Sequence, residues 1–244
     1  SLDNSKNMII NKYYFINDKP DINIGRYLDD RLGIVIDIDP VFDSHFSGVV
    51  GAVKNMNNHW NLNGELDIQL ENLWNTMESF SFYWKKLDSS NQVINLSLAS
   101  PHFFDNGMGI NSQFKYDLVD GLYIESQTSI DFEITSKSFG SFFLGYNSGK
   151  INTTGRGKNF SYKESNYNSL SFIFRHNSYN KRYLPEIGKK IIIENNLGKD
   201  TYNDKLFYKI SMILNQIFPL YKNINISINS WNQYINSPDG VTNP

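Results

Sequence analysis

The chain has 244 residues, a formal net charge of -2 at pH 7 and no cysteine. The near-neutral charge predicts no nucleic-acid partner, and the lack of cysteine excludes disulfides, thiolate zinc sites and a cysteine nucleophile. No apolar run approaches the roughly 18 to 20 residues of a transmembrane helix, which excludes a helical membrane protein but leaves room for a β-barrel, whose strands alternate.

The first 40 residues differ from the rest of the chain. Charged residues crowd around Pro20, the alternating apolar run 32–38 follows, and Pro40 then interrupts the chain. We therefore predict two units: residues 1–40 end a small soluble domain, and residues 41–244 form the β-structure that it leads into.

Alternation of apolar and polar residues dominates the second unit. In 60–71, Trp60 and Leu66 fall on one face while Glu65 and Asp67 fall on the other. Aromatic residues make up 15% of the chain, which is typical of β-structure. The pattern predicts an all-β, antiparallel up-and-down meander of about eleven strands. Their expected ranges are 46–54, 60–71, 79–85, 94–99, 110–118, 122–134, 142–146, 170–176, 190–196, 206–215 and 224–231.

The expected connections differ in length, as in outer-membrane barrels, which have short turns on the periplasmic side and longer loops outside. Tight turns are predicted at 72–76, 135–138 and 219–223. A long polar loop is predicted at 147–167, and its glycine-rich segment 155–158 lacks the strand and helix context of a phosphate-binding loop. We therefore expect an extracellular loop there.

Three segments of the second unit have a distinctive order and spacing. They are Phe46-Ser47-Gly48-Val49-Val50-Gly51, then Asn72-Leu73-Trp74-Asn75 with Glu78, Phe80 and Trp84, then Ser100-Pro101-His102-Phe103-Phe104 with Gly109 and Ile110. Together they resemble the Omp85 superfamily of outer-membrane barrels, particularly its BamA/TamA-like and ShlB-like members. The motifs cover residues 32 to about 135, and the rest of the chain agrees with the family by strand pattern only.

The resemblance implies a transmembrane barrel of about sixteen strands, of which about eleven are present here, preceded by the end of a periplasmic POTRA-like domain at residues 1–40. The family's Arg-Gly-Phe loop is absent from the sequence, which stops in 236–244, where that loop would begin. We therefore expect the first part of a longer barrel, whose strand edges would need partners in a bilayer.

The function that the resemblance implies is insertion or translocation of other proteins at the outer membrane of a Gram-negative bacterium. The expected partners are the lipid bilayer, outer-membrane or secreted client proteins, and periplasmic or lipoprotein accessory subunits. The first strand would form one side of a lateral gate that templates an incoming strand. Its residues are Phe46, Ser47, Gly48, Val49, Val50, Gly51, Ala52 and Val53.

Charged residues on the polar strand faces are expected to line a water-filled lumen rather than to catalyse a reaction, because both signs of charge are mixed. They are Glu65, Asp67, Lys85, Lys115, Asp131 and Glu133. The histidines His45, His59, His102 and His176 are too scattered in the sequence for a metal site. We expect no enzymatic activity, no cofactor and no metal.

Two other interpretations stay open at this point. The barrel could be a passive channel or the membrane anchor of a patatin-like phospholipase. Alternation alone also fits a soluble β-sandwich, in which large aromatic residues form the core. In a barrel they would form interfacial girdles instead, and the residues concerned are Trp60, Trp74, Trp84, Tyr146 and Trp231.

Overall fold

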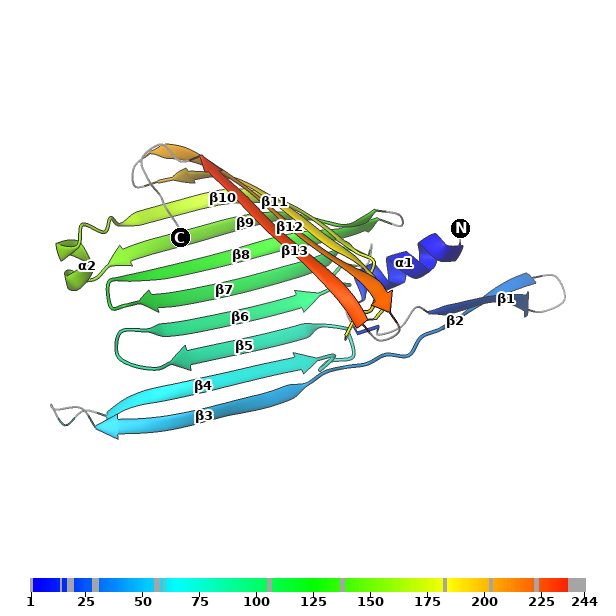
Figure 1. The fold of residues 1–244 in the computed structure, drawn as a ribbon, viewed down its shortest axis with the longest axis horizontal. Helices are drawn as coiled ribbons and strands as arrows, with labels where there is room; N and C mark the ends of the chain where they lie inside the picture. The colour runs from blue at the N-terminus through cyan, green and yellow to red at the C-terminus, as the bar shows by residue number, and fades with distance from the viewer. Residues whose placement is uncertain are drawn as a thin grey trace.

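The chain is almost entirely β-structure. The computed structural model describes residues 2–13, 15–16, 20–27, 31–54, 58, 60–104, 107–136, 139–181, 184–201, 204–221 and 224–236. The helix α1 (Leu2–Lys12) comes first, and β1 (Asp21–Tyr27) and β2 (Arg31–Asp37) then form a two-stranded sheet of their own. The elements α1, β1 and β2 lie at one end of the molecule (Figure 1). A bridge pairs Ile16, which follows α1, with Pro40, which follows β2.

All later strands of the described chain form one antiparallel sheet of eleven strands in sequence order, each paired with its neighbours in the chain. The predicted all-β, up-and-down fold is confirmed, as are the number and order of its strands. The strands are β3 (His45–Lys54), β4 (Trp60–Glu71), β5 (Ser79–Lys86), β6 (Gln92–Ser100), β7 (Gly109–Val119), β8 (Tyr123–Ser136), β9 (Gly140–Thr153), β10 (Ser165–Asn177), β11 (Gly188–Asp200), β12 (Lys205–Tyr221) and β13 (Ile224–Asn236).

The long polar loop predicted at 147–167 is wrong. β9 continues to Thr153 and β10 begins at Ser165, so that the connection shrinks to 154–164 and includes the short helix α2 (Gly155–Asn159). Thr154 caps this helix by accepting a hydrogen bond from the Gly157 N–H at 3.0 Å, and its hydroxyl donates to the carbonyl of Leu122. The segment 155–158 is therefore an ordered cap over the β7–β8 turn.

The predicted difference in length between the two sets of connections is also wrong. At the end of the sheet that carries α1, the longest connection is 178–187, and at the other end it is 154–164. These two are similar in length, and each end also has a short connection, at 222–223 and 120–122. Connection length therefore does not distinguish the two ends of this sheet.

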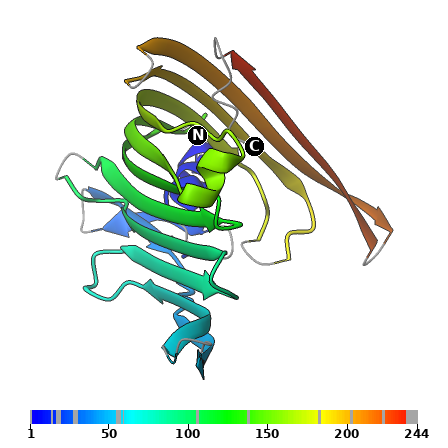
Figure 2. The same ribbon diagram turned by 90° about the vertical axis from the view of Figure 1, so that its left-hand side faces the viewer.

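The sheet curls strongly around α1 (Figure 2). Directly paired residues of antiparallel strands project to the same face, and the register therefore assigns each residue to one of two faces. Ile130, Tyr146 and Leu170 pair in one row of the apolar face, whereas Asp131, Gly145 and Ser171 pair in a row of the other. The polar face is the concave one, because it shares a cavity with residues of α1.

Large apolar side chains on the convex face are exposed. In the described chain only six hydrophobic residues are buried, and three of them, Ile9, Phe15 and Ile16, belong to a small cluster near α1. By contrast, Leu144 and Leu170 on the convex face are 61% and 59% exposed. Among the described residues, therefore, no protein layer covers the apolar side of the sheet, unlike the inner face of a sandwich.

The aromatic residues expected at membrane interfaces divide between the faces. Trp84 and Tyr146 lie on the apolar face, while Trp74 lies in the β4–β5 turn. Trp231 pairs with Ile213 on the concave face, which contradicts its place in an outward girdle. Both helices of the described residues are too short and too polar to cross a bilayer.

Candidate functional site

The strand β3 is one free edge of the large sheet. It pairs along its whole length with β4, from His45 opposite Gln69 to Lys54 opposite Trp60, and no described strand pairs with its other side. Every residue of β3 is exposed, including Val49 at 71%. The predicted gate residues 46–53 thus lie in one strand whose backbone can accept another strand.

Glycines bring β3 unusually close to β4. A Cβ on Gly48 would approach the Leu66 side chain at 2.5 Å, and one on Gly51 would approach the Asn63 side chain at 2.9 Å. On the opposite strand, Gly64 has a φ of 149° and its missing Cβ would lie 2.1 Å from the Val49 carbonyl oxygen. Only glycine fits position 64 without moving β3.

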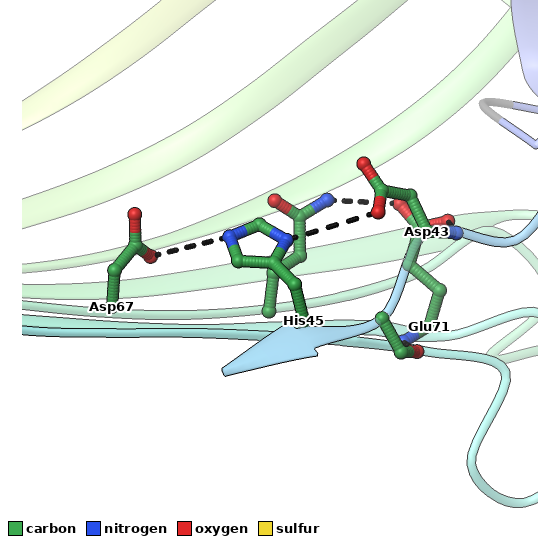
Figure 3. Close-up of polar contacts among 6 residues, drawn as sticks. Asp43, His45, Asp67 and Glu71 are labelled. Atoms are coloured by element: carbon green, nitrogen blue, oxygen red, sulfur yellow. Dashed lines mark hydrogen bonds and ion pairs between the residues drawn. The ribbon is translucent and has the colours of Figure 1, made fainter. Parts of the chain in front are cut away.

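The start of β3 is fastened to the end of β4 by Glu71, which is only 6% exposed. Its carboxylate accepts hydrogen bonds from the Asp43 N–H at 2.6 Å and from the Gln69 side chain at 3.0 Å. The Glu71 N–H in turn donates to the Ser44 hydroxyl at 2.9 Å. β3 therefore has a firm anchor where it begins (Figure 3).

His45 stands beside this anchor, between two carboxylates. Its Nδ1 lies 3.8 Å from Asp43 and its Nε2 lies 3.8 Å from Asp67, with all three side chains partly exposed (Figure 3). These distances suit ion pairs when His45 is protonated. The described residues contain no group of three or more side chains placed to hold a metal.

The six predicted lumen residues fall on the same, concave face of the sheet by register. The structure brings Glu65 and Lys85 together at 3.0 Å, and the Tyr83 hydroxyl donates to Glu65 at 2.9 Å. Asp67 contacts His45 instead.

The remaining lumen residues are separate from this pair. Asp131 accepts from the Ser171 hydroxyl at 3.1 Å, and Glu133 accepts from the Thr135 hydroxyl at 3.3 Å. Lys115 lies on the same face, between Asn95 and Gln127 of the neighbouring strands. The face is a dispersed polar surface with small residues such as Ser171, which is 2% exposed, among its charged side chains.

The N-terminal segment contacts the connection between β6 and β7 at the α1 end of the sheet. The Lys12 ammonium donates to the Gly107 carbonyl, and the Tyr13 hydroxyl lies 2.6 Å from His102 Nε2. Burial lowers the pKa of His102, and the positive charge of Lys12 lowers it further. Burial also lowers the pKa of Lys12, although the Glu133 carboxylate opposes this change.

A cavity of about 370 Å³ lies between α1 and the sheet, lined on the sheet side by Glu133, Arg175 and Lys190 among others. The contact between the N-terminal segment and the sheet, and the anchor at Glu71, were not predicted from the sequence. Both depend on residues far apart in the chain, so local alternation contains no signal for them. Of the remaining histidines, His176 contacts the Phe139 carbonyl at 3.1 Å, and His59 lies outside the described residues.

No family model matches the sequence, and no curated protein matches it. Among solved structures, the chain is similar to a crystal structure of BamA from Haemophilus ducreyi that lacks POTRA domains 1–3. The TM-score is 0.54 and the identity 15%, over 93% of this chain and 48% of that one. This chain thus spans about half the length of that protein, and the likeness at this identity is one of fold.

Proposed function

We propose that the chain belongs to an Omp85-type barrel that inserts or translocates other polypeptides at the outer membrane of a Gram-negative bacterium. The observation that carries this proposal is the sidedness of the curled sheet, with exposed apolar residues on its convex face and polar residues on its concave face. An uncovered apolar surface of this extent needs lipid or protein against it. The similarity in fold to a BamA barrel supports lipid.

In this proposal the N-terminal residues 1–40 are the end of a periplasmic POTRA-like domain, and 41–244 form the first part of the barrel wall. The end of the sheet that carries α1 then faces the periplasm. The protein acts on client polypeptides without enzymatic chemistry, together with periplasmic or lipoprotein accessory subunits.

β3 is the proposed contact for clients. Its free backbone groups can template an incoming strand, its start is held by Glu71, and its exposed middle has a neighbour on one side only. This arrangement lets the strand open from its far end while it stays attached to the wall. The six charged residues of the concave face would line the aqueous interior beside it.

Membrane insertion is tested by expressing, in a Gram-negative host, the longer barrel protein of which this chain is proposed to be the first part, and by fractionating the envelope. We expect the protein in the outer-membrane fraction, extractable by detergent and with heat-modifiable migration. A chain that stays in the aqueous fraction as a folded monomer would contradict the barrel assignment.

Client contact is tested with a photo-crosslinking residue in place of Ser47 on the free edge. We expect crosslinks to nascent outer-membrane or secreted proteins. The matched control replaces Ser97, which lies on the same concave face but in the interior strand β6. Equal crosslinking at both positions would show that the edge has no special role.

A passive channel is the second candidate, and the polar concave face is the observation that favours it. Single-channel conductance separates the two functions. A stable open pore without client crosslinks at Ser47 would support the channel.

A further inference from the structure

The convex face of β8, β9 and β10 changes character abruptly along the strands. Three successive rows near the α1 end are apolar: Ile134, Phe142 and Phe174, then Phe132, Leu144 and Phe172, then Ile130, Tyr146 and Leu170. The next two rows are polar: Thr128, Ser148 and Asn168, then Ser126, Lys150 and Asn166. We call the six residues of these two polar rows the polar ledge.

Successive rows on one face are two residues apart, which corresponds to about 7 Å along the strand. If the sheet lies in a membrane as proposed above, the boundary between lipid chains and headgroups on β8–β10 therefore falls between the Tyr146 row and the Ser148 row. On β7 the two polar rows continue as Phe114 and Tyr116, so the boundary crosses the rows there. Tyr146 at this boundary is 50% exposed and suits an interfacial position. The polar ledge lies just above it, at headgroup level on the side opposite α1.

The ledge has the chemistry of a site for a phosphorylated sugar. It offers hydroxyl groups from serine and threonine and amide groups from Asn166 and Asn168, and these groups surround a shallow cavity of about 290 Å³. Lys150 is exposed beside the cavity, and no carboxylate of the described residues pairs with it. Hydroxyls and amides bond sugar hydroxyls, and a free ammonium group bonds phosphate.

We propose that the polar ledge binds the phosphorylated sugar headgroup of an outer-leaflet glycolipid, with Lys150 on the phosphate and Asn166 and Asn168 on the sugar. The acyl chains of the same lipid then lie against the apolar rows directly below. This inference rests on the proposed outer-membrane location. It adds a specific lipid contact on the wall, away from the free edge β3.

Location in the bilayer is measured first, so that the two proposals can fail separately. Because the native chain has no cysteine, single Ile130→Cys and Ser148→Cys variants can each carry one fluorophore. We expect lipid-chain quenchers to affect the label at residue 130 and aqueous quenchers to affect the label at residue 148. If both labels are quenched only from water, the outer-membrane proposal itself fails.

Glycolipid binding is then measured with the chain in nanodiscs of phosphatidylethanolamine. The nanodiscs contain no additive, a phosphorylated disaccharide lipid, or phosphatidylglycerol of equal charge. We expect retention of the sugar lipid to fall about tenfold in Lys150→Gln and to fall further when Asn168→Ala is added. The control is Lys189→Gln, which removes an exposed lysine from the same face at the α1 end.

Two results would overturn the glycolipid site while leaving the membrane location intact. One is equal retention of the sugar lipid by Lys150→Gln and by Lys189→Gln. The other is equal retention of phosphatidylglycerol and the sugar lipid by the native chain, since this would indicate attraction to negative charge without recognition of the sugar.

Discussion

The edge hairpin β3–β4 and the curved wall β8–β10 each contain a glycine in a strained conformation. The strand that it contacts has one neighbouring strand in the hairpin and two in the wall. In each region a glycine with positive φ starts or interrupts a strand, and its missing Cβ would lie against a carbonyl of the next strand. A Cβ on Gly64 would lie 2.1 Å from the Val49 carbonyl oxygen, and a Cβ on Gly140 would lie 2.2 Å from the Arg175 carbonyl oxygen. β3 has a free side toward which it can move, whereas β10 is held between two strands.

The number of neighbouring strands, rather than local geometry, should decide how the sheet responds to a strained residue. In the wall, a displaced strand would disturb two ladders and the close packing of the concave face, where Ser171 is 2% exposed. At the edge, the same displacement disturbs a single ladder. The same glycine-to-alanine substitution should therefore lower the stability of the whole sheet more in the wall than at the edge, where its effect should be mainly local.

The largest effect is expected for Gly140→Ala. Positive φ and the overlap with the Arg175 carbonyl should together lower the free energy of unfolding by about 3 kcal/mol. Urea unfolding in detergent, followed by tryptophan fluorescence, measures this change. A loss no larger than that of an alanine replacement at an exposed turn would show that β10 moves more freely than its two neighbours suggest.

Gly64→Ala should have a smaller global effect of about 1 kcal/mol, because β3 can shift away from the added methyl group. Its main effect should be local, namely faster amide exchange across 45–54 with little change in β8–β10. Uniformly faster exchange over the whole sheet would erase the distinction between edge and wall.

Glu71→Gln tests whether the edge is anchored at its beginning. A glutamine offers one acceptor oxygen to the two donors, Asp43 N–H and the Gln69 side chain, and hydrogen bonds to a charged group contribute about 1.5 kcal/mol or more. We expect exchange at 43–47 to speed up about tenfold. The control is Glu186→Gln in an exposed ion pair with Lys181, which should change little.

The smallest effect is a pH dependence in the β4–β5 turn. Burial raises the pKa of Glu78, but hydrogen bonds from the Thr76 hydroxyl and from the Trp74, Glu78 and Thr76 backbone N–H groups outweigh it and hold the pKa below its usual value. The unfolded chain then binds more protons than the folded one, so this contribution is complete at neutral pH and is lost below about pH 4.

Comparison with Glu78→Gln isolates this contribution. The native chain should be the more stable of the two at pH 7, and the difference should shrink as the pH falls to about 3. A constant difference over this range would assign the stabilisation to another group. The turn lies next to the edge hairpin, so the measurement also reports how far acid loosens that region relative to the wall.

Much of this fold could be predicted from alternation, and its failures have a physical cause. Where one face is apolar and the other polar, as in 60–71, the predicted strand has the observed bounds. At the far ends of β9 and β10 both faces are polar, with Asn147 beside Ser148 and Asn166 close by. The alternation of apolar and polar residues disappears there, so the sequence predicts a loop at 147–167 where β9 and β10 in fact continue.

The site was predictable only in part. The register of two strands follows from the geometry of the hairpin that joins them, so the pairing of Glu65 with Lys85 could be predicted from the sequence. The contact of Asp43 with Glu71 extends the β3–β4 register, in which His45 pairs with Gln69. The contact of Tyr13 with His102 joins segments whose approach depends on the curvature of the whole sheet. Alternation contains no measure of how a sheet curves, nor of packing on the concave face such as that of the Tyr167 ring above Gly149.

Because Trp231 lies on the concave face and Trp84 on the convex face, the two indole rings lie in different environments. Trp84 projects from the convex face and Trp231 from the concave one, where it is 65% exposed. If the convex face contacts lipid and the concave face contacts water, Trp84 should emit at a shorter wavelength than Trp231. Brominated lipids should then quench Trp84, and iodide should quench Trp231. With Trp60 and Trp74 replaced by phenylalanine, the emission of the two remaining tryptophans would report, without any attached dye, which face of the wall is in contact with water.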